Sequence, residues 1–476
     1  MIRARRVEHK EPGNKRHEGN SEMNVVTIGT GYVGINTAAA LAYIGHHVAG
    51  VDVDARKIAM LRERRAPISE AGLDALLASL QTIRFTTELS EVLGEADVVF
   101  IAVGTPSRPD GQANLDYVYS AAAQIGAALS PARDVTIVVK STVPVGVNGM
   151  IETRIREAVQ TRGGDGTKLH FASNPEFLRE GCALHDTFYP DRFVIGTRDD
   201  KAFQMLTELF APILEQSFVP PTSVPSPSPR PRPQCLHTDP ISSEMVKYAS
   251  NVFLALKISY ANEIAGLCEK LGGNMADISR GMGMDRRIAP YFLQSGLGWG
   301  GSCFPKDSLA LLSMARDYGY EMPIVEAAVH VNRRQLDRIV FKILDKLRVL
   351  PGKRIAVLGL SFKPNTDDVR NSPSVELAQE LVRRGACVCV HDPAGLANAR
   401  TIYKDDGFLF CDTPAEAAKN ADALVIATDW ADYRALDWSA IRRLMRGACL
   451  FDARNLLRDT MVKNPHLLDG FEYQGL

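Results

Sequence analysis

The sequence predicts an α/β protein with two parallel-sheet parts joined by a helical region. Short apolar runs rich in β-branched residues alternate with helical stretches from Asn24 onward, and this alternation resumes at Pro351. Strands that alternate with helices form βαβ units on a parallel sheet. Between the two parts, a long helical pattern covers 243–271. At roughly 150 residues per domain, the chain has room for about three domains.

The apolar pattern also places individual elements. In the first part, strands are expected at 25–29, 47–52, 97–104 and 135–141, with a helix at 38–45. In the second part, strands are expected at 354–360, 387–392 and 423–429. For the long helix, Ser242 or Ser243 can cap the start, and Gly272 and Gly273 fit the C-terminal end. A helical region should continue to about residue 349.

Composition and charge exclude several classes of function. Hydrophobic residues make up 45% and charged residues 23%, as in ordinary globular proteins. The 55 basic and 56 acidic residues nearly cancel, whereas binding to nucleic acid or an anionic membrane depends on accumulated positive charge. The longest apolar runs have only the length of a strand, and we see no signal peptide. We therefore expect a cytoplasmic protein that binds neither nucleic acid nor membranes and has no metal site.

Two segments are expected to lie outside the folded domains. Residues 1–22 are polar and charged, which indicates a disordered leader. The 14 residues of 220–233 include seven prolines, and proline removes donors and fixes φ. This segment is expected to be an exposed loop or linker, with a ligand for a partner domain as the alternative. The expected domains are 23–215, 241–350 and 351–476, with the linker at 216–240.

The motif GTGYVG follows a strand and opens a helix, as a dinucleotide-binding G-x-G-x-x-G does. Gly29 permits the tight turn, Gly31 lets a pyrophosphate approach the backbone, and Gly34 permits close packing of helix and strand. Asp52 ends the next strand, where a carboxylate binds ribose hydroxyls and repels a 2′-phosphate. The motif therefore predicts a Rossmann-like domain that binds NAD rather than NADP.

Three further positions are candidates for cofactor contact. Lys57 lies close enough to Asp52 in sequence to reach the adenosine side. Thr105 and Thr142 each follow an expected strand, at the sheet edge where ligands bind in open α/β folds. Threonines before prolines also occur as ordinary strand terminators, so both interpretations stay open for these two hydroxyls.

Eight cysteines are scattered without the spacing of a disulfide framework, and seven of them are expected to be reduced packing residues. Cys303 differs because it lies in the glycine-rich run GWGGSCFPKD. The glycines are expected to leave its sulfur accessible and to offer backbone N–H donors. Lys306 or another cation would lower the thiol pKa, and Asp307 is a candidate base or water holder. These residues alone leave a catalytic and a structural cysteine equally open.

Long motifs along the chain resemble those of the nucleotide-sugar dehydrogenase family. The resemblance covers roughly residues 23–460 and is carried by GTGYVG, KSTVPVG, SNPEFLREG, PDRFVIG, EMVKYASN, GGSCFPKD and LGLSFKPNTDDVRNSP. It implies the oxidation of a sugar primary alcohol to a carboxylate in two NAD-dependent steps. The wording of GGSCFPKD and SNPEFLREG favours UDP-glucose as the substrate over GDP-mannose or N-acetylmannosamine nucleotides.

The resemblance also implies catalytic roles. Cys303 would trap the aldehyde as a thiohemiacetal and then carry a thioester. Lys247 and Asn251, at i and i+4 on one helix face, would stabilise the oxygen at the reacting carbon. Glu176 would be the base for thioester hydrolysis. The residues matched to the catalytic water are Thr142 and Asp307.

The motif and the resemblance together give the expected ligand contacts. For the cofactor they are Gly29, Gly31, Tyr32, Val33, Gly34, Asp52, Lys57, Thr105, Thr142, Glu180, Lys306 and Arg370. For the UDP-sugar they are Glu176, Phe177, Leu178, Arg179, Glu180, Lys247, Asn251, Arg287, Phe292, Leu293, Gln294, Ser295, Gly296, Gly300 and Lys363. The chain departs from the family's usual pattern at Ala289, where relatives usually carry glycine, and at Ser295, where they usually carry proline.

The resemblance extends to domain roles and assembly. The 354–360 strand lacks a full G-x-G-x-x-G, so the third domain is expected to be a degenerate Rossmann-like domain that binds the UDP half. Arg287 would reach a neighbouring subunit's substrate, and the 243–271 helix would pack against its partner in a homodimer or higher homo-oligomer. From periodicity alone, that helix fits an intrachain core equally well.

Three other functions stay open at this point. The chain could oxidise another nucleotide hexose, such as a UDP-N-acetylhexosamine or GDP-mannose. It could be a two-electron hydroxyacid dehydrogenase with an unrelated thiol, which predicts one NADH per substrate and leaves the third domain unexplained. It could also be a catalytically inactive nucleotide-binding relative, although such a protein would normally have lost the nucleophile or the base.

Overall fold

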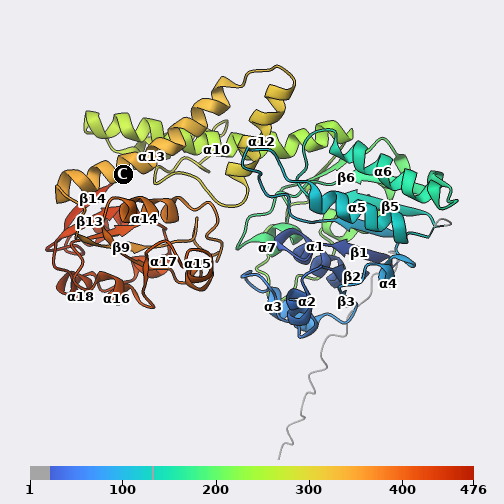
Figure 1. The fold of residues 1–476 in the computed structure, drawn as a ribbon, viewed down its shortest axis with the longest axis horizontal. Helices are drawn as coiled ribbons and strands as arrows, with labels where there is room; N and C mark the ends of the chain where they lie inside the picture. The colour runs from blue at the N-terminus through green and yellow to red at the C-terminus, as the bar shows by residue number, and fades with distance from the viewer. Residues whose placement is uncertain (1–21, 131–132) are drawn as a thin grey trace, which may run out of the picture.

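A computed structural model describes residues 22–130 and 133–476, so the expected leader lies outside the described residues except for Glu22. The predicted fold class is confirmed: two α/β units with parallel sheets are connected by a helical region. Figure 1 shows the two units side by side, with the long helix α10 (Pro240–Leu271) running past both.

The first sheet has eight strands in the order β3-β2-β1-β4-β5-β6-β7-β8. All neighbours are parallel except β6 and β7, which pair antiparallel at Ser173 and Gly196. The sequence predicted a parallel sheet, and this one reversal is the exception. The strands are β1 (Asn24–Ile28), β2 (His47–Val51), β3 (Ile83–Thr86), β4 (Val98–Ile101), β5 (Val135–Val139), β6 (Leu169–Ser173), β7 (Arg192–Gly196) and β8 (Gln234–Thr238).

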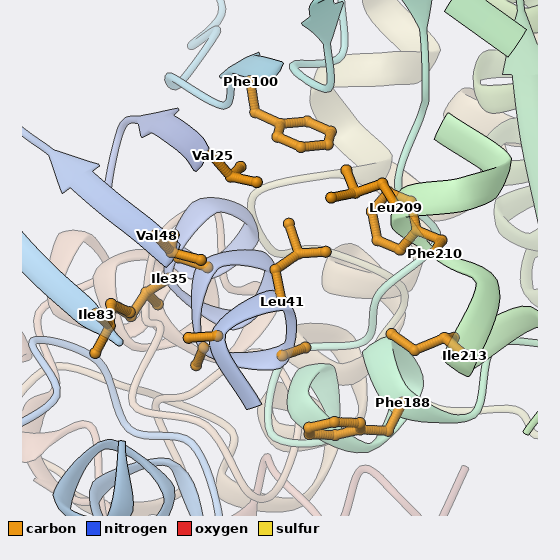
Figure 2. Close-up of a cluster of buried hydrophobic side chains, with 14 of the residues drawn as sticks. Val25, Ile35, Leu41, Val48, Ile83, Phe100, Phe188, Leu209, Phe210 and Ile213 are labelled. Carbon is orange, nitrogen blue, oxygen red and sulfur yellow. The ribbon is translucent and has the colours of Figure 1, made fainter. Parts of the chain in front are cut away.

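Helices cover both faces of this sheet because its central strands, such as β4 and β5, are apolar and buried on both sides. One core includes Leu41 and Phe188 from two helices packed against each other, and Figure 2 shows their side chains gathered with those of Val25 and Phe210. The helices are α1 (Tyr32–Tyr43), α2 (Ala55–Arg62), α3 (Leu73–Ser79), α4 (Ser90–Leu93), α5 (Asp116–Ala128), α6 (Val147–Thr161), α7 (Ala183–Phe188), α8 (Asp200–Leu209) and α9 (Ala211–Leu214), with a 3₁₀ turn at Gly166–Lys168.

The proline-rich segment is an irregular loop, but it is not wholly exposed. Val224 is buried in the first core, and the carbonyl of Ser223 lies so close to Gly72 that a Cβ there would come within 2.2 Å of it. The Arg230 side chain donates to the carbonyl of Phe218. The segment is therefore tied to the first domain, and strand β8, inside the expected linker, extends that domain's sheet.

The long helix begins three residues earlier than predicted, because the cap is Asp239 rather than Ser242 or Ser243. The Asp239 carboxylate accepts a hydrogen bond from the backbone N–H of Ser242 at 3.0 Å. Gly272, with a φ of 71°, ends the helix as predicted. Three more helices complete the central region, namely α11 (Met275–Gly283), α12 (Phe304–Asp317) and α13 (Pro323–Leu347).

The second sheet has the order β11-β10-β9-β12-β13-β14, and all its neighbours are parallel. Its strands are β9 (Arg354–Leu358), β10 (Cys387–His391), β11 (Leu409–Phe410), β12 (Ala423–Ile426), β13 (Cys449–Asp452) and β14 (Glu472–Gly475). Its helices are α14 (Pro373–Arg383), α15 (Leu396–Ile402), α16 (Pro414–Ala418), α17 (Ala431–Arg434), α18 (Trp438–Leu444) and α19 (Arg458–Lys463). In both sheets the first strand lies centrally, so each has a switch point at the carboxyl ends of its middle strands, where ligands bind.

Within residues 22–130 and 133–476, no helix combines the length and the apolar character that crossing a membrane requires.

Candidate active site

The glycine-rich turn between β1 and α1 has the predicted geometry. Gly29 has a φ of 95°, and a Cβ there would lie 2.6 Å from the carbonyl oxygen of Ala102. A Cβ at Gly34 would lie 1.8 Å from the carbonyl oxygen of Gly29, whereas one at Gly31 would meet nothing within 4 Å. Gly29 and Gly34 therefore serve close packing, and Gly31 leaves room for a ligand at the start of α1.

Asp52 holds this turn as well as facing the site. Its Oδ2 accepts from both the backbone N–H and the hydroxyl of Thr30, each at 2.9 Å, and Oδ1 accepts from the N–H of Asp54. Burial raises the pKa of Asp52, but these hydrogen bonds and Lys57, whose Nζ is 3.7 Å away, outweigh it and lower the pKa. The carboxylate is therefore ionised and fixed.

The two threonines predicted at strand ends do meet. The Thr105 hydroxyl, after β4, donates to the carbonyl of Thr142, after β5, at 2.8 Å. The Thr105 hydroxyl thus has a structural partner, while the Thr142 side chain remains partly exposed at the same edge of the sheet.

A buried ion pair joins the segment after β6 to the long helix. Glu176 Oε1 and Lys247 Nζ are 2.6 Å apart, and the two side chains are 8% and 4% exposed. Glu176 Oε2 accepts from the N–H of Leu178. Burial raises the pKa of Glu176, but Lys247, this N–H and Lys140 outweigh burial and lower it. Burial also lowers the pKa of Lys247, yet Glu176 and the nearby thiol and carboxylate raise it overall. Both groups are charged.

A second polar set lies one helical turn further along α10. The Asn251 amide donates to Asp307 Oδ2 at 2.6 Å, and the Lys306 ammonium donates to Asp307 Oδ1. Asp307 is completely buried. The structure therefore brings together Lys247 and Asn251 from α10 with Asp307 from α12, as the spacing of the two α10 residues required.

Cys303 lies at the start of α12, next to both sets. Burial raises its pKa from the ordinary value of 9.0 to about 11, and Glu176 and Asp307 add to this increase, while Lys247 and Lys306 oppose it. The sequence-based expectation of a lowered thiol pKa is therefore wrong for this state of the protein. Nearby cations do act in the expected direction, but the cost of burying a thiolate is larger.

One glycine of the loop around Cys303 (298–307), which we expected to offer a free N–H donor, is already engaged. The N–H of Gly301 is taken by the carbonyl of Asn371 at 3.1 Å, and a Cβ at Gly301 would overlap the ring of Phe362. A Cβ at Gly300 would lie 2.3 Å from the same Asn371 carbonyl. These glycines allow the third domain to approach the thiol loop, which puts Cys303 at the junction of three domains.

Glu180 connects all three domains. Its carboxylate accepts from the hydroxyl of Ser302 at 2.7 Å and from that of Thr366 at 3.4 Å. Burial and the neighbouring Asp368 raise the pKa of Glu180 to about 7. Tyr32, expected at the cofactor, reaches the third domain too, because its hydroxyl donates to Asp367 at 2.9 Å.

Other predicted contacts lie around this junction. Burial lowers the pKa of Lys363, which lies within electrostatic range of Glu180 and has no ion-pair partner within the described chain. Arg370 pairs with Asp368, and the exposed Arg179 pairs with Asp186. The Phe177 ring lies 3.8 Å from the Arg192 guanidinium and 5.6 Å from Lys247 Nζ. Val33, at the start of α1, accepts through its carbonyl from the hydroxyl of Thr37.

The loop expected to bind the sugar nucleotide, 292–296, forms hydrogen bonds with two helices. The Ser279 hydroxyl donates to the carbonyl of Leu293, and the N–H of Gly296 donates to Asn262 of α10 at 2.8 Å. Phe292 and Ala289 have φ values of 63° and 60°, so the alanine where relatives usually carry glycine adopts the left-handed conformation.

Not every predicted site residue lies near the polar groups around Cys303. Gln294 is exposed, and the amide of Asn455 lies 3.5 Å from the Ser295 hydroxyl. Arg287 is 85% exposed and pairs with Asp285. Within one chain, therefore, the structure does not bring Arg287 to the site.

Three residues at the site were missed by sequence reasoning. Lys140 and Asn174 form a buried pair beside Glu176, with Lys140 Nζ 2.8 Å from Asn174 Oδ1. Arg454 donates to the carbonyls of Ala427 and Gly298, and these two hydrogen bonds join the third domain to the loop that carries Cys303. A lysine that directly follows an apolar strand was the available signal for Lys140, whereas nothing local distinguishes Arg454.

These features define a class of protein. The glycine turn, the open position at Gly31 and the ionised Asp52 suit NAD, and a thiol with two sets of charged partners lies at the domain junction. The molecule is an NAD-dependent dehydrogenase.

Comparison with known proteins identifies the family. Models of the UDP-glucose/GDP-mannose dehydrogenase family match at 23–214 (NAD binding domain), 241–334 (central domain) and 356–459 (UDP binding domain). The chain belongs to this family, which confirms the predicted NAD cofactor and the class of enzyme.

Similar proteins extend over nearly the whole chain. The chain is 42% identical to the UDP-glucose 6-dehydrogenase YwqF of Bacillus subtilis, covering 91% of this chain and 93% of that protein. It is 43% identical to a UDP-glucose 6-dehydrogenase of Rhizobium meliloti, covering 95% and 99%. The structure of a UDP-glucose dehydrogenase from Pyrobaculum islandicum superimposes with a TM-score of 0.81 at 38% identity, covering 93% and 97%.

Proposed function

We propose that this protein oxidises UDP-glucose to UDP-glucuronate, reducing two NAD per sugar and consuming one water. The observation that carries the proposal is that Cys303 lies within electrostatic range of both the Glu176–Lys247 pair and Asp307, which in turn accepts from Asn251. The names of the similar proteins support UDP-glucose as the sugar nucleotide.

The residues of the glycine turn fit NAD. The backbone at Gly31 is open to a pyrophosphate, the N-terminus of α1 favours its charge, and Asp52 is ionised for ribose hydroxyls. When bound, NAD accepts one hydride from the reacting carbon in each of the two oxidations. The ionised Asp52 would repel a 2′-phosphate, which favours NAD over NADP.

In the first half of the reaction, the chain's residues handle a proton and an oxyanion. A water held at Thr142 and Asp307 takes the proton of the sugar's primary alcohol as the aldehyde forms. Cys303 then attacks the aldehyde carbon, forming the C–S bond of a thiohemiacetal. Because the thiol is protonated at neutral pH, its proton passes to the former carbonyl oxygen, which becomes the hydroxyl of the thiohemiacetal. The Lys247 ammonium and the Asn251 amide stabilise the charge that develops on this oxygen during the attack.

In the second half, the thiohemiacetal gives its hydroxyl proton to the water at Thr142 and Asp307 as it is oxidised, which leaves a thioester on Cys303. Glu176, ionised and fixed by Lys247 and the N–H of Leu178, accepts a proton from water as that water attacks the thioester carbonyl. The C–S bond breaks, the sulfur leaves and regains a proton, and the carboxylate product is released. The chain's own residues thus account for both bonds made to the sugar carbon.

The decisive experiment measures NADH formed per sugar with the purified protein. UDP-glucose should give two NADH and UDP-glucuronate, with much lower rates on UDP-N-acetylhexosamines and GDP-mannose. Cys303→Ala should abolish turnover to the acid. Two NADH per sugar in Cys303→Ala would refute the cysteine mechanism, and a faster rate on another nucleotide sugar would refute the substrate.

We also propose that the protein acts in the cytoplasm as a homodimer or higher homo-oligomer. Large apolar side chains on α10 support the dimer, since Phe253, Tyr260, Leu267 and Leu271 are 48–75% exposed. Arg287, exposed and outside its own chain's cluster, would then be free to reach the partner's substrate. Sedimentation of the wild type and Phe253→Glu tests this: a wild-type monomer would refute it, and Phe253→Glu should dissociate the dimer.

A further inference from the structure

A second buried ammonium lies beside the Glu176–Lys247 pair. Lys140 directly follows β5 and is only 7% exposed. Its Nζ donates to Asn174 Oδ1 at 2.8 Å, and it lies 6.0 Å from the centre of the Phe193 ring. No carboxylate forms an ion pair with it within the described residues. A buried cation held only by an amide is costly, so its presence needs a reason.

Its surroundings point to Glu176. Asn174, the acceptor for Lys140, is buried and is anchored in turn by a hydrogen bond from its amide to the carbonyl of Val194. Asn174 lies two residues before Glu176 on the same segment after β6. The charges that act on Lys140 are those of Glu176 from this segment and Lys247 from α10. Lys140 therefore lies within electrostatic range of the same carboxylate that pairs with Lys247.

We propose that Lys140 is a positioning residue and the second counter-charge of Glu176. It keeps this carboxylate ionised when Lys247 turns to the oxygen of the sugar carbon. In the structure, Lys247 is the direct partner of Glu176, but during the reaction the same ammonium has to stabilise the substrate's oxygen. Without a second cation, the buried Glu176 would then tend to take up a proton and lose its ability to act as a base.

The directions of the pKa shifts of Lys140 and Glu176 agree with this role. Burial lowers the pKa of Lys140 to about 8. The charge of Glu176 partly opposes this decrease, and the charge of Lys247 adds to it. The side chain is still mostly protonated at neutral pH. Its charge in turn contributes to the lowered pKa of Glu176. Because Asn174 fixes the ammonium, this contribution does not depend on a mobile side chain.

The inference rests on the proposed function, and it is tested by the pH dependence of thioester hydrolysis. Lys140→Gln removes the charge but can still donate to Asn174, so it separates charge from hydrogen bonding. We expect its acid limb of kcat to move up by about one pH unit. Below that limb, a sugar adduct on Cys303 should accumulate, detected by intact mass after acid quench. Lys140→Arg keeps the charge and should keep the wild-type limb. Lys140→Met, an apolar replacement of similar length, serves if Lys140→Gln does not fold.

Lys201→Met is the matched control, because this lysine lies in the same domain with a side chain that is 69% exposed. Its profile should match the wild type. Superimposable profiles for Lys140→Gln and the wild type would refute the proposal, as would equal shifts in Lys140→Gln and Lys140→Arg. If the wild type itself forms no UDP-glucuronate, it is the proposed function that fails. If the wild type forms UDP-glucuronate and the pH profile of Lys140→Gln is not shifted, only the role of Lys140 is refuted.

Discussion

The reactivity of Cys303 toward an alkylating agent should respond in opposite directions to the two halves of the buried ion pair. A pKa of about 11 in place of 9.0 lowers the thiolate fraction at pH 8 about a hundredfold, to about one molecule in a thousand. Glu176 raises the pKa of this thiol, and Lys247 lowers it. Glu176→Gln removes a negative neighbour and also frees Lys247 to act on the sulfur.

We expect Glu176→Gln to alkylate at Cys303 about tenfold faster than the wild type at pH 8, and Lys247→Met about tenfold slower, since one pKa unit changes the thiolate fraction tenfold at this pH. The assay is iodoacetamide labelling followed by peptide mass spectrometry over pH 6–10. The exposed Cys387 in the third domain is the internal reference in the same digest. Equal rates in both variants, or a slower rate in Glu176→Gln, would contradict the electrostatic account of the site.

Three further predictions address the cofactor turn, the domain junction and the substrate loop. Gly31→Ala should fold normally but weaken NAD binding at least about tenfold, whereas Gly34→Ala should lower the free energy of unfolding by about 1–3 kcal/mol, as thermal unfolding and NAD titration would show. Glu180 has a pKa of about 7 in the folded protein, above its ordinary value of 4.5. The free energy of unfolding of the wild type should therefore fall as the pH rises from about 4.5 to 7, by up to about 3 kcal/mol. Urea unfolding at pH 5 and 7.5 should find a smaller decrease in Glu180→Gln. Ala289→Gly should stabilise the protein by about 0.5–1 kcal/mol in the same assay, because glycine accepts the φ of 60° without strain. Unchanged stability in Gly34→Ala, an undiminished pH dependence in Glu180→Gln or a loss of stability in Ala289→Gly would count against each argument in turn.

Some features of the fold could be predicted because they depend only on short stretches of sequence. The β-branched runs of β1, β4 and β5 are buried on both faces, and their alternation with helices led directly to parallel sheets. The reversal of β7 against β6 could not be seen, since the direction of a strand depends on where the chain returns. The cap of α10 was misplaced by three residues because Asp239, Ser242 and Ser243 are all good capping residues, and only the backbone decides among them.

The candidate site shows the same division. The glycine-rich run marked Cys303 as a candidate among eight cysteines, and the family resemblance then selected it as the nucleophile. The same resemblance selected Lys247 and Asn251, whose spacing puts them on one helix face. Contacts across long separations were beyond local patterns: Lys140 lies 34 residues from Asn174, and Tyr32 lies 335 residues from Asp367.

The sequence by itself determined the alternation of strands and helices and the glycine turn with Asp52 after the next strand, since both follow from short-range periodicity and side-chain chemistry. It marked Cys303 as a candidate, and the family resemblance favoured a catalytic role for this thiol. Only the tertiary structure decided the charge state of Cys303, the double counter-charge around Glu176 and the three-domain contact at Glu180. A pKa depends on the solvent excluded and the charges brought near by every packed element. That environment exists only once the three domains have closed around the site.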